Sequence, residues 1–445
     1  MNKLFGTDGI RGLVGHYPMT PEIMLKLGKS SAKIFKSNQS RHKILIGKDT
    51  RISGYILESA LTSGICSMGL DVLLVGPLPT PAIAHLAKNL NASAGIVISA
   101  SHNPAQDNGV KFFSNKGIKL SDEIEKKIES LVFKNIFKSV PSEKTGKAYR
   151  LQDAKSRYIE FAKSAIKNNL QGFKIVLDCA NGAAYAVAPI IFEELGAQTI
   201  ILNNKPDGLN INKDCGALHP KVVSKEVKKH NANIGIAFDG DADRVIIVDE
   251  NGSELNGDHI MALCAIDMLK NNNLNKKTLV ATVYSNLGLD KTIEKAGGKV
   301  VRVKNGDRYV IEEMLKNNYN FGGERSGHII FSDYTTTGDG IIAALRVLDI
   351  MKKTNKKLSE LKTCLKEFPQ VLINVKVKKK IPFEQLPNVN KAIKQAQTIL
   401  KNNGRLLIRY SGTENIARVM IEGKDKKLIT KLANNIAGEI KKCNS

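Results

Sequence analysis

The sequence predicts an α/β protein with three related α/β domains, followed by a smaller α+β domain. Two observations lead to this prediction. Short apolar runs rich in β-branched residues alternate with stretches of helical periodicity, which is the pattern of βα units with parallel strands. The chain also has 445 residues, which is too long for one compact core, because domains usually contain about 100 to 200 residues.

Three apolar runs open the first three domains, and each ends in a polar loop. They are residues 43–47, 174–178 and 278–283. Helical patterns follow each run, at 55–68, 185–195 and 289–296, and further strands are predicted at 71–75 and 198–202. We therefore expect α/β domains at 1–150, 151–252 and 253–367.

Residues 368–445 show a different pattern, with strands grouped around two helices. The strands are predicted at 371–377, 405–409 and 418–423, and the helices at 389–402 and 425–440. This segment is therefore expected to be an α+β domain. Small-molecule sites usually lie where domains meet, so we expect each of the four domains to contribute one loop to a common site.

The composition excludes several classes of protein. Hydrophobic content of 42% and charged content of 25% are those of an ordinary globular protein and not of a disordered chain. No apolar run approaches the ~18 residues that cross a bilayer, and the first residues lack the apolar core of a signal peptide. The six cysteines contain no CxxC pair, which favours reduced thiols. We expect a cytoplasmic enzyme.

The net charge of +24 raises the question of an anionic partner. A basic surface attracts nucleic acid, anionic lipid or phosphorylated small molecules. The lysines are scattered, there is no Trp, and aromatic residues make up only 5% of the chain, so a base-stacking platform is not indicated. Compositional drift is the simplest explanation of the charge. Attraction of a phosphate ester is the next, and no nucleic acid or membrane partner is expected.

The polar loop 99–104 lies between predicted strands at 94–98 and 109–113 and contains Ser101. Most serines in polar loops have only a structural role. Here His102 and Asn103 follow directly and Lys111 lies just beyond, and a serine nucleophile needs such neighbours because its hydroxyl is weak when free. The chain has no GxSxG motif, which argues against an acyl-transfer hydrolase.

A second loop carries Asp239, Asp241 and Asp243, followed by Arg244, directly after an apolar stretch at 234–238. Carboxylates this close repel one another unless a cation neutralises them, and their oxygens suit Mg²⁺ or Ca²⁺. An EF-hand would need Gly where Arg244 stands. Mg²⁺ prefers few protein ligands plus a phosphate oxygen, so three Asp residues with a phosphorylated Ser101 would form a suitable site. A solvated acidic turn is the alternative.

Two further loops have polar groups suited to a sugar phosphate. Glu324 and Ser326, in a glycine-flanked segment, would present an acceptor and a hydroxyl to vicinal sugar hydroxyls. Near the end of the chain, a loop between two strands combines guanidinium groups, hydroxyls and a glycine, a set that can cradle a monophosphate. Its residues are Arg409, Ser411, Gly412, Thr413 and Arg418. The Walker spacing for nucleoside triphosphates is absent.

Together these four motifs resemble the α-D-phosphohexomutase family, in the family's order and over residues 4–423. Other segments look like the bacterial members that act on glucosamine phosphates: 5–12, 206–212, 285–289, 305–310, 335–341 and 369–375. The resemblance implies a heart-shaped, four-domain isomerase around a central cleft. It would interconvert glucosamine 6-phosphate and glucosamine 1-phosphate through a phosphoserine and a 1,6-bisphosphate, and so supply amino-sugar nucleotides for cell-wall precursors.

The resemblance also implies a role for each motif. Ser101 would be the phosphoserine, required for activity, and Asp239, Asp241 and Asp243 would bind one Mg²⁺ per chain with it. Glu324 and Ser326 would hold the sugar, with Arg244 near the metal loop. The substrate's non-reacting phosphate would be held by Arg409, Ser411, Gly412, Thr413 and Arg418. Proton transfer or charge stabilisation would fall to Arg11, Lys111 and His328. The oligomeric state stays open, a homodimer included.

Two alternatives remain at this stage. The first is a mutase of the same family that acts on glucose or mannose phosphate, because Glu324 and Ser326 do not by themselves recognise an amino group at C2. The second is a nucleic-acid-binding protein, which would show salt-sensitive affinity that survives Ser101→Ala. A nucleic-acid-binding function would not explain the acidic loop at Asp239–Asp243.

Overall fold

The computed structural model describes residues 3–6, 8–36, 42–411 and 415–443. These residues form two compact units. The larger unit comprises Met1–Tyr284 and Ala296–Cys364, and the smaller comprises Ser285–Lys295 and Leu365–Ser445. Within the described ranges, no helix is long and apolar enough to cross a membrane.

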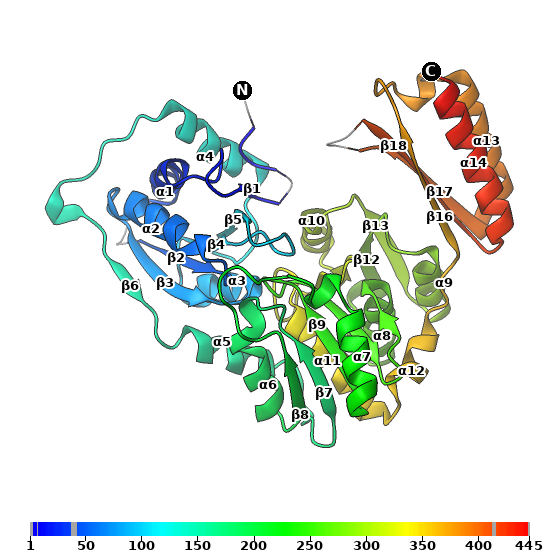
Figure 1. The fold of residues 1–445 in the computed structure, drawn as a ribbon, viewed down its shortest axis with the longest axis horizontal. Coiled ribbons are helices and arrows are strands. Elements are labelled where there is room, and N and C mark those ends of the chain that lie inside the picture. Colours follow the sequence, from blue (N-terminus) through cyan, green and yellow to red (C-terminus); the bar gives the residue numbers. More distant parts are fainter. Residues whose placement is uncertain (1–2, 7, 37–41, 412–414, 444–445) are drawn as a thin grey trace. The chain divides into compact units, whose positions relative to one another are not determined.

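The first sheet of the larger unit has six strands in the order β1-β5-β4-β2-β3-β6 (Figure 1). The strands are β1 (Ile10–Leu13), β2 (Lys43–Lys48), β3 (Asp71–Pro77), β4 (Ala94–Ile98), β5 (Asp107–Ser114) and β6 (Ala148–Arg150). Its helices are α1 (Pro21–Phe35), α2 (Ser53–Cys66), α3 (Thr80–Asn89) and α4 (Asp122–Lys134).

Alternation along the strands decides which helix covers which face of this sheet. Ile46 and Ile96 point into a core that also contains Leu27 of α1, Leu61 of α2 and Ile128 of α4. The residues next to these isoleucines, Gly47 and Gly95, face α3, and a Cβ at Gly47 would stand 2.2 Å from the side chain of Ile83. The missing side chains therefore let α3 pack closely against the opposite face.

Two more sheets complete the larger unit, in the orders β11-β10-β9-β7-β8 and β13-β12-β14-β15. The second sheet contains β7 (Lys174–Asp178), β8 (Gln198–Leu202), β9 (Ile234–Phe238), β10 (Val245–Asp249) and β11 (Glu254–Leu255). The third contains β12 (Thr278–Thr282), β13 (Lys299–Val303), β14 (Phe321–Gly323) and β15 (Ile329–Phe331). The accompanying helices are α5 (Ala154–Lys163), α6 (Ala188–Glu194), α7 (Lys221–His230), α8 (Gly257–Lys270), α10 (Asp307–Asn317), α11 (Gly340–Thr354) and α12 (Leu358–Leu361).

The smaller unit is an antiparallel sheet with two helices on one face. Its strands, in the order β16-β18-β17, are β16 (Gln370–Lys376), β18 (Ile416–Gly423) and β17 (Gly404–Tyr410). The helices α13 (Pro387–Leu400) and α14 (Lys426–Lys442) lie side by side against it (Figure 1), and Val389, Val419 and Ile436 share its core. Helix α9 (Leu287–Lys295) belongs to this unit as well.

The expectation of parallel sheets was correct for β2, β3, β4 and β6, for β7, β8 and β9, and for β12, β13 and β14, but wrong for one later strand in each of these three sheets. β5 runs antiparallel to β4, β10 to β9, and β15 to β14. The connections between these strands contain only five to eight residues, whereas a parallel crossover needs a dozen or more. The short loops therefore force a reversal of direction.

Candidate active site

All four polar motifs of the sequence occupy the same kind of position, the connection between two antiparallel strands. The Ser101 loop joins β4 to β5, and the loop with Asp239, Asp241 and Asp243 joins β9 to β10. The Glu324 loop joins β14 to β15, and the loop after Tyr410 joins β17 to β18. In the first three cases the strand before the loop has a parallel neighbour, so each loop stands at the carboxyl edge of its sheet, where small-molecule sites of α/β proteins are found.

Ser101 and Asp239 meet directly, although 138 residues separate them. The Ser101 Oγ donates a hydrogen bond to Asp239 Oδ2 at 2.6 Å, and His102 Nδ1 lies 3.3 Å from the same Oγ. Burial, together with the nearby Arg244 and Arg11, lowers the pKa of His102 to about 4. The imidazole is therefore neutral at neutral pH and can accept or donate one hydrogen bond at the serine.

Asp239, Asp241 and Asp243 are buried and offer carboxylate oxygens that all lie within 4.8 Å of one another. Burial raises the pKa of Asp239 well above its usual range, and the other two carboxylates raise it further. Within the described ranges, Asp241 Oδ1 and Asp243 Oδ1 have no hydrogen-bond partner. Buried carboxylate oxygens without donors suit a divalent cation, because hard oxygen ligands are what Mg²⁺ and Ca²⁺ require. The residues present thus fit a metal.

Lys111, on β5, supplies a fixed positive charge to this cluster. Its Nζ lies 2.8 Å from Asp241 Oδ2 and 3.1 Å from Asp243 Oδ2. Burial alone would lower the pKa of Lys111, but these carboxylates, with Asp8 at 3.7 Å, raise it well above the ordinary value. Lys111 is therefore a permanent cation, suited to stabilise negative charge and poorly suited to accept a proton.

Asp8 joins the other cations of this region. Its carboxylate pairs with Arg11 and with Lys119, and Lys119 also pairs with Asp307 at the start of α10. Burial would raise the pKa of Asp8, but the surrounding cations hold it well below its usual range. Asp8 is thus an anion that fixes the Arg11 guanidinium beside Lys111.

His328 and Arg244 approach the cluster from other directions. His328 Nδ1 lies 3.6 Å from Asp243 Oδ1, and its Nε2 accepts a hydrogen bond from the Gly338 N–H at 2.9 Å. Burial would lower the pKa of His328, but nearby carboxylates, Asp243 foremost, raise it. The Arg244 backbone N–H donates to Asp239 Oδ1 at 3.1 Å, and its Nε lies 3.8 Å from Asp243 Oδ1.

The residues expected to bind the sugar are adjacent and differ in exposure. Glu324 is buried, and its Oε1 accepts a hydrogen bond from the Gly306 N–H at 3.1 Å. The exposed Ser326 donates its Oγ–H to Glu324 Oε2 at 3.4 Å. The acceptor and the hydroxyl therefore lie together, and Oε2 keeps lone pairs for a ligand.

The phosphate motif lies in the smaller unit. Arg409 of β17 is paired directly with Arg418 of β18, and the Ser411 N–H donates to the Ile416 carbonyl at 2.8 Å. The Lys380 ammonium donates to the Ser411 carbonyl at 2.7 Å, which adds a cation. Gly412 and Thr413, also expected in this motif, lie outside the described residues.

Sequence reasoning missed several groups that complete the site. The Thr80 hydroxyl donates to Asp241 Oδ2 at 2.7 Å, and nothing in the Pro-Thr-Pro segment indicated this role. Asp8 and Asp307 stand inside the segments 5–12 and 305–310, which were noted only as a resemblance. In the sequence each of these aspartates stands next to one glycine, Asp8 before Gly9 and Asp307 after Gly306, and this was the available signal.

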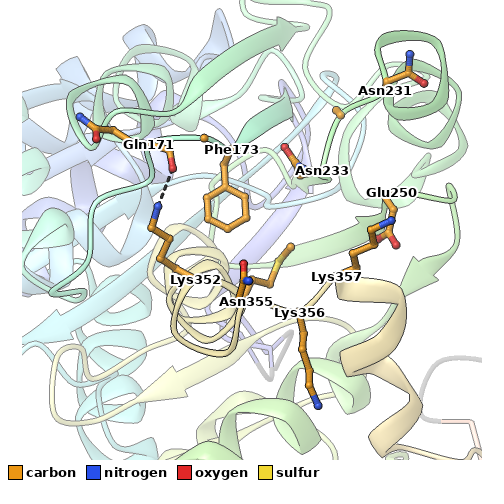
Figure 2. Close-up of a pocket in the computed structure, with 12 residues that line it drawn as sticks. Gln171, Phe173, Asn231, Asn233, Glu250, Lys352, Asn355, Lys356 and Lys357 are labelled. Carbon is orange, nitrogen blue, oxygen red and sulfur yellow. Dashed lines mark hydrogen bonds between the residues drawn. The ribbon is translucent and has the colours of Figure 1, made fainter.

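A cavity of about 670 Å³ lies elsewhere in the larger unit (Figure 2). Phe173 and Asn233 on its wall precede β7 and β9, whereas the Asp239 loop follows β9. The cavity is therefore at the opposite edge of the second sheet, and none of the predicted site residues lines it. The candidate active site is the cluster around Ser101.

The chain matches the models of all four parts of one family. They are described as phosphoglucomutase/phosphomannomutase alpha/beta/alpha domain I (residues 2–139), domain II (156–252), domain III (256–368) and C-terminal domain (372–439). Proteins named phosphoglucosamine mutase from Pelobacter propionicus and Geobacter metallireducens are 57% and 56% identical to it, and each alignment covers 99% of both chains.

Solved structures share the fold at lower identity. A phosphoglucomutase/phosphomannomutase family protein from Burkholderia thailandensis has a TM-score of 0.83 at 23% identity, over 99% of this chain and 97% of that one. An Aspergillus fumigatus N-acetylphosphoglucosamine mutase, solved with GlcNAc-6P and magnesium, has a TM-score of 0.66 at 17% identity, over 100% and 96%. The chain belongs to the phosphoglucomutase/phosphomannomutase family.

Proposed function

We propose that the protein is an isomerase that interconverts glucosamine 6-phosphate and glucosamine 1-phosphate. The observation that carries the proposal is the hydrogen bond of 2.6 Å from Ser101 Oγ to Asp239, beside a buried cluster of three carboxylates that fits a divalent cation. The identity of 57% to a relative named phosphoglucosamine mutase supports glucosamine as the sugar. The product would enter amino-sugar nucleotide synthesis in the cytoplasm.

The proposed active form carries a phosphoryl group on Ser101. The O1 hydroxyl of glucosamine 6-phosphate attacks this phosphorus, a new P–O1 bond forms, and the bond to Ser101 Oγ breaks. The O1 proton leaves, and the serine oxygen regains a proton. The resulting 1,6-bisphosphate turns end for end, and Ser101 Oγ loses its proton as it attacks the 6-phosphate. The bond between phosphorus and O6 breaks, and O6 takes up a proton to become a hydroxyl. Glucosamine 1-phosphate is released and the phosphoserine is restored.

Neutralisation of charge is the main task of the side chains in this reaction. A phosphoserine carries about −1.5 to −2 charges at neutral pH, and the incoming sugar phosphate is also an anion. Mg²⁺, held by Asp239, Asp241, Asp243 and a phosphoserine oxygen, would supply the Lewis acid. Lys111 and Arg11 add positive charge that is already fixed by Asp8 and the aspartate cluster, so little reorganisation is needed.

The other predicted site residues are proposed to bind the sugar and its second phosphate or to transfer protons. Glu324 and Ser326 accept and donate hydrogen bonds at the sugar hydroxyls. Arg409, Ser411 and Arg418 bind the phosphate that does not react. His328 is proposed, with Arg11 and Lys111, for proton transfer or charge stabilisation. Because Lys111 stays charged and guanidinium groups do not give up protons in proteins, Lys111 and Arg11 stabilise negative charge, and proton transfer falls to His328 or to the neutral His102 beside the serine.

The test combines mass and turnover. Intact mass after incubation with a hexose 1,6-bisphosphate and Mg²⁺ should show one phosphoryl adduct, mapped to Ser101 by peptide analysis. A coupled assay should then convert glucosamine 6-phosphate faster than glucose or mannose 6-phosphate. Turnover without any adduct would reject the mechanism, and faster turnover of glucose or mannose 6-phosphate would reject the substrate.

A further inference from the structure

The backbone of Ser101 is left-handed, with φ of +52°. This region is unfavourable for a residue with a side chain, and such a conformation persists only where the surrounding structure holds it. The backbone conformation sets the direction of the side chain. With this φ the Ser101 side chain points towards Asp239, and a change of φ would turn the hydroxyl away from the carboxylate cluster.

Two side chains hold the carbonyl groups on either side of His102. Arg51 Nη2 donates to the Ser101 carbonyl at 3.3 Å and to the Asn103 carbonyl at 2.6 Å. Asn212 Nδ2 donates to the same two carbonyls, at 2.9 Å and 3.0 Å. We call Arg51 and Asn212 the backbone clamp. It fixes two peptide groups of the loop from two directions.

Both members of the clamp are themselves fixed. Arg51 is 0% exposed, its guanidinium pairs with the buried Asp49, and its own backbone N–H donates to Asp49 Oδ1 at 2.9 Å. Asn212 is 9% exposed, and its backbone N–H donates to the Ala180 carbonyl at 2.9 Å.

The clamp also meets the metal loop. A Cβ at Gly240 would lie 2.6 Å from the Ser101 carbonyl and 2.7 Å from Asn212 Nδ2. The absence of a side chain at Gly240 therefore lets the backbone of the aspartate loop touch both the serine loop and the clamp. Ser101, Asn212 and the loop that carries Asp239 and Asp241 form one packed unit.

We propose that Arg51 and Asn212 are positioning residues for phosphoryl transfer, which hold the strained Ser101 backbone so that Oγ faces the metal site. The inference rests on the proposed function of Ser101 as the phosphoryl carrier. The clamp binds backbone carbonyls and not Oγ, so it holds the loop equally with and without a phosphoryl group. The site then keeps its geometry while the bisphosphate intermediate turns.

The test compares Asn212→Gly with Asn231→Gly. Both residues are left-handed asparagines of the same part of the chain, with φ of +59° and +50°, and glycine tolerates both conformations. Only Asn212 contacts the serine loop, whereas Asn231 lies on the cavity of Figure 2. We expect Asn212→Gly to lower kcat about 10- to 100-fold, the effect of a misplaced reacting group. KM for glucosamine 6-phosphate and the Mn²⁺ dissociation constant should change less than about threefold.

Arg51→Lys is the second variant, because it keeps a positive charge beside Asp49 but lacks the second nitrogen that reaches the carbonyls. It should also lower kcat selectively. Two results would reject the positioning role of Arg51 and Asn212. One is an equal kcat in Asn212→Gly and Asn231→Gly, and the other is a loss of activity that raised KM or weaker metal binding explains completely.

A crystal structure of Asn212→Gly separates this inference from the proposed function. If the clamp holds the Ser101 backbone, the variant structure should show that φ of Ser101 has left the left-handed region or that Oγ has moved away from Asp239. If this change occurs while the parent protein shows neither adduct nor turnover, the role of the clamp is supported and the role of Ser101 as phosphoryl carrier is rejected. An unchanged Ser101 conformation in the variant refutes the clamp.

Discussion

Arg409 stands directly opposite Arg418 in the antiparallel pair of β17 and β18. Directly opposite residues of such a pair have their Cβ atoms about 5 Å apart on one face of the sheet, and like charges in this position are unfavourable. A bound phosphate can interact favourably with two neighbouring guanidinium groups at once. The pairing is therefore consistent with the phosphate site predicted for this loop.

Arg409→Ala should weaken the binding of the sugar phosphate more than it slows the chemical step. Loss of one charge-assisted contact to phosphate is expected to raise KM for glucosamine 6-phosphate roughly 10- to 100-fold, with a smaller change in kcat. Steady-state kinetics measure both constants. Lys394→Ala, an exposed residue of α13, is the control for lost surface charge. An unchanged KM in Arg409→Ala would remove the phosphate assignment.

Ser101→Ala should abolish both the phosphoryl adduct and turnover, because no other group replaces the hydroxyl that forms the covalent intermediate. We expect a fall in kcat of about a thousandfold or more. Intact mass and the coupled assay are the measurements. Ser59→Ala, which alters an exposed serine of α2, should behave like the parent protein. Substantial turnover in Ser101→Ala would mean that another residue carries the phosphoryl group.

Asp241→Asn should weaken metal binding, since it replaces one of three carboxylates with a neutral amide of the same size. Mn²⁺ titration followed by electron paramagnetic resonance should give a dissociation constant raised about 100-fold or more, because loss of a residue that only supports a metal ligand already costs about 10- to 100-fold. Asp153→Asn removes an exposed carboxylate from an ion pair with Arg157 and serves as the matched control. Equal affinity in the two variants would place the metal elsewhere.

Removal of the metal should lower thermal stability even without substrate. A ligand that binds only the folded state stabilises it by about 2.7 kcal/mol when its concentration is a hundredfold above its dissociation constant. Scanning calorimetry with EDTA and then with excess Mg²⁺ should therefore show a Tm that falls and recovers. Asp241→Asn should lose most of this response. If the Tm of the parent protein does not change when Mg²⁺ is added or removed, the prediction of a metal site is wrong.

A separate prediction concerns His85 of α3, which stacks on Phe161 with ring centroids 3.6 Å apart. Burial, aided by Lys88, lowers the pKa of His85 to about 4, whereas the unfolded value is about 6.5. Between these values the unfolded chain binds a proton that the folded chain does not. The stability from this group is therefore present above about pH 6.5 and is lost as the pH falls towards 4.

His85→Gln removes this titration, so the Tm of the variant should fall less between pH 7.5 and pH 5 than the Tm of the parent. Calorimetry at both values gives the two differences. Because acidic side chains titrate in both proteins, only the comparison is informative. Parallel losses of Tm would show that His85 does not contribute.

Much of the fold could be predicted because strand ends are local features. The apolar runs at Ala94–Ile98, Lys174–Asp178 and Ile234–Phe238 coincide with β4, β7 and β9. The polar residues after them mark the loops, so Ser101 and the three aspartates were found as candidates. Their catalytic and metal-binding roles remain predictions, as do the domain boundaries expected near residues 150, 252 and 367.

The sequence by itself determined which groups are available at the strand ends, because polar residues that end an apolar run must either reach solvent or find polar partners. Only the tertiary structure decided which of them meet. Thr80 and Lys111 converge on Asp241 across 161 and 130 residues, and Arg51 and Asn212 fix the left-handed Ser101 from separate segments. Such contacts depend on how sheets and loops pack, and no local pattern of residues encodes them.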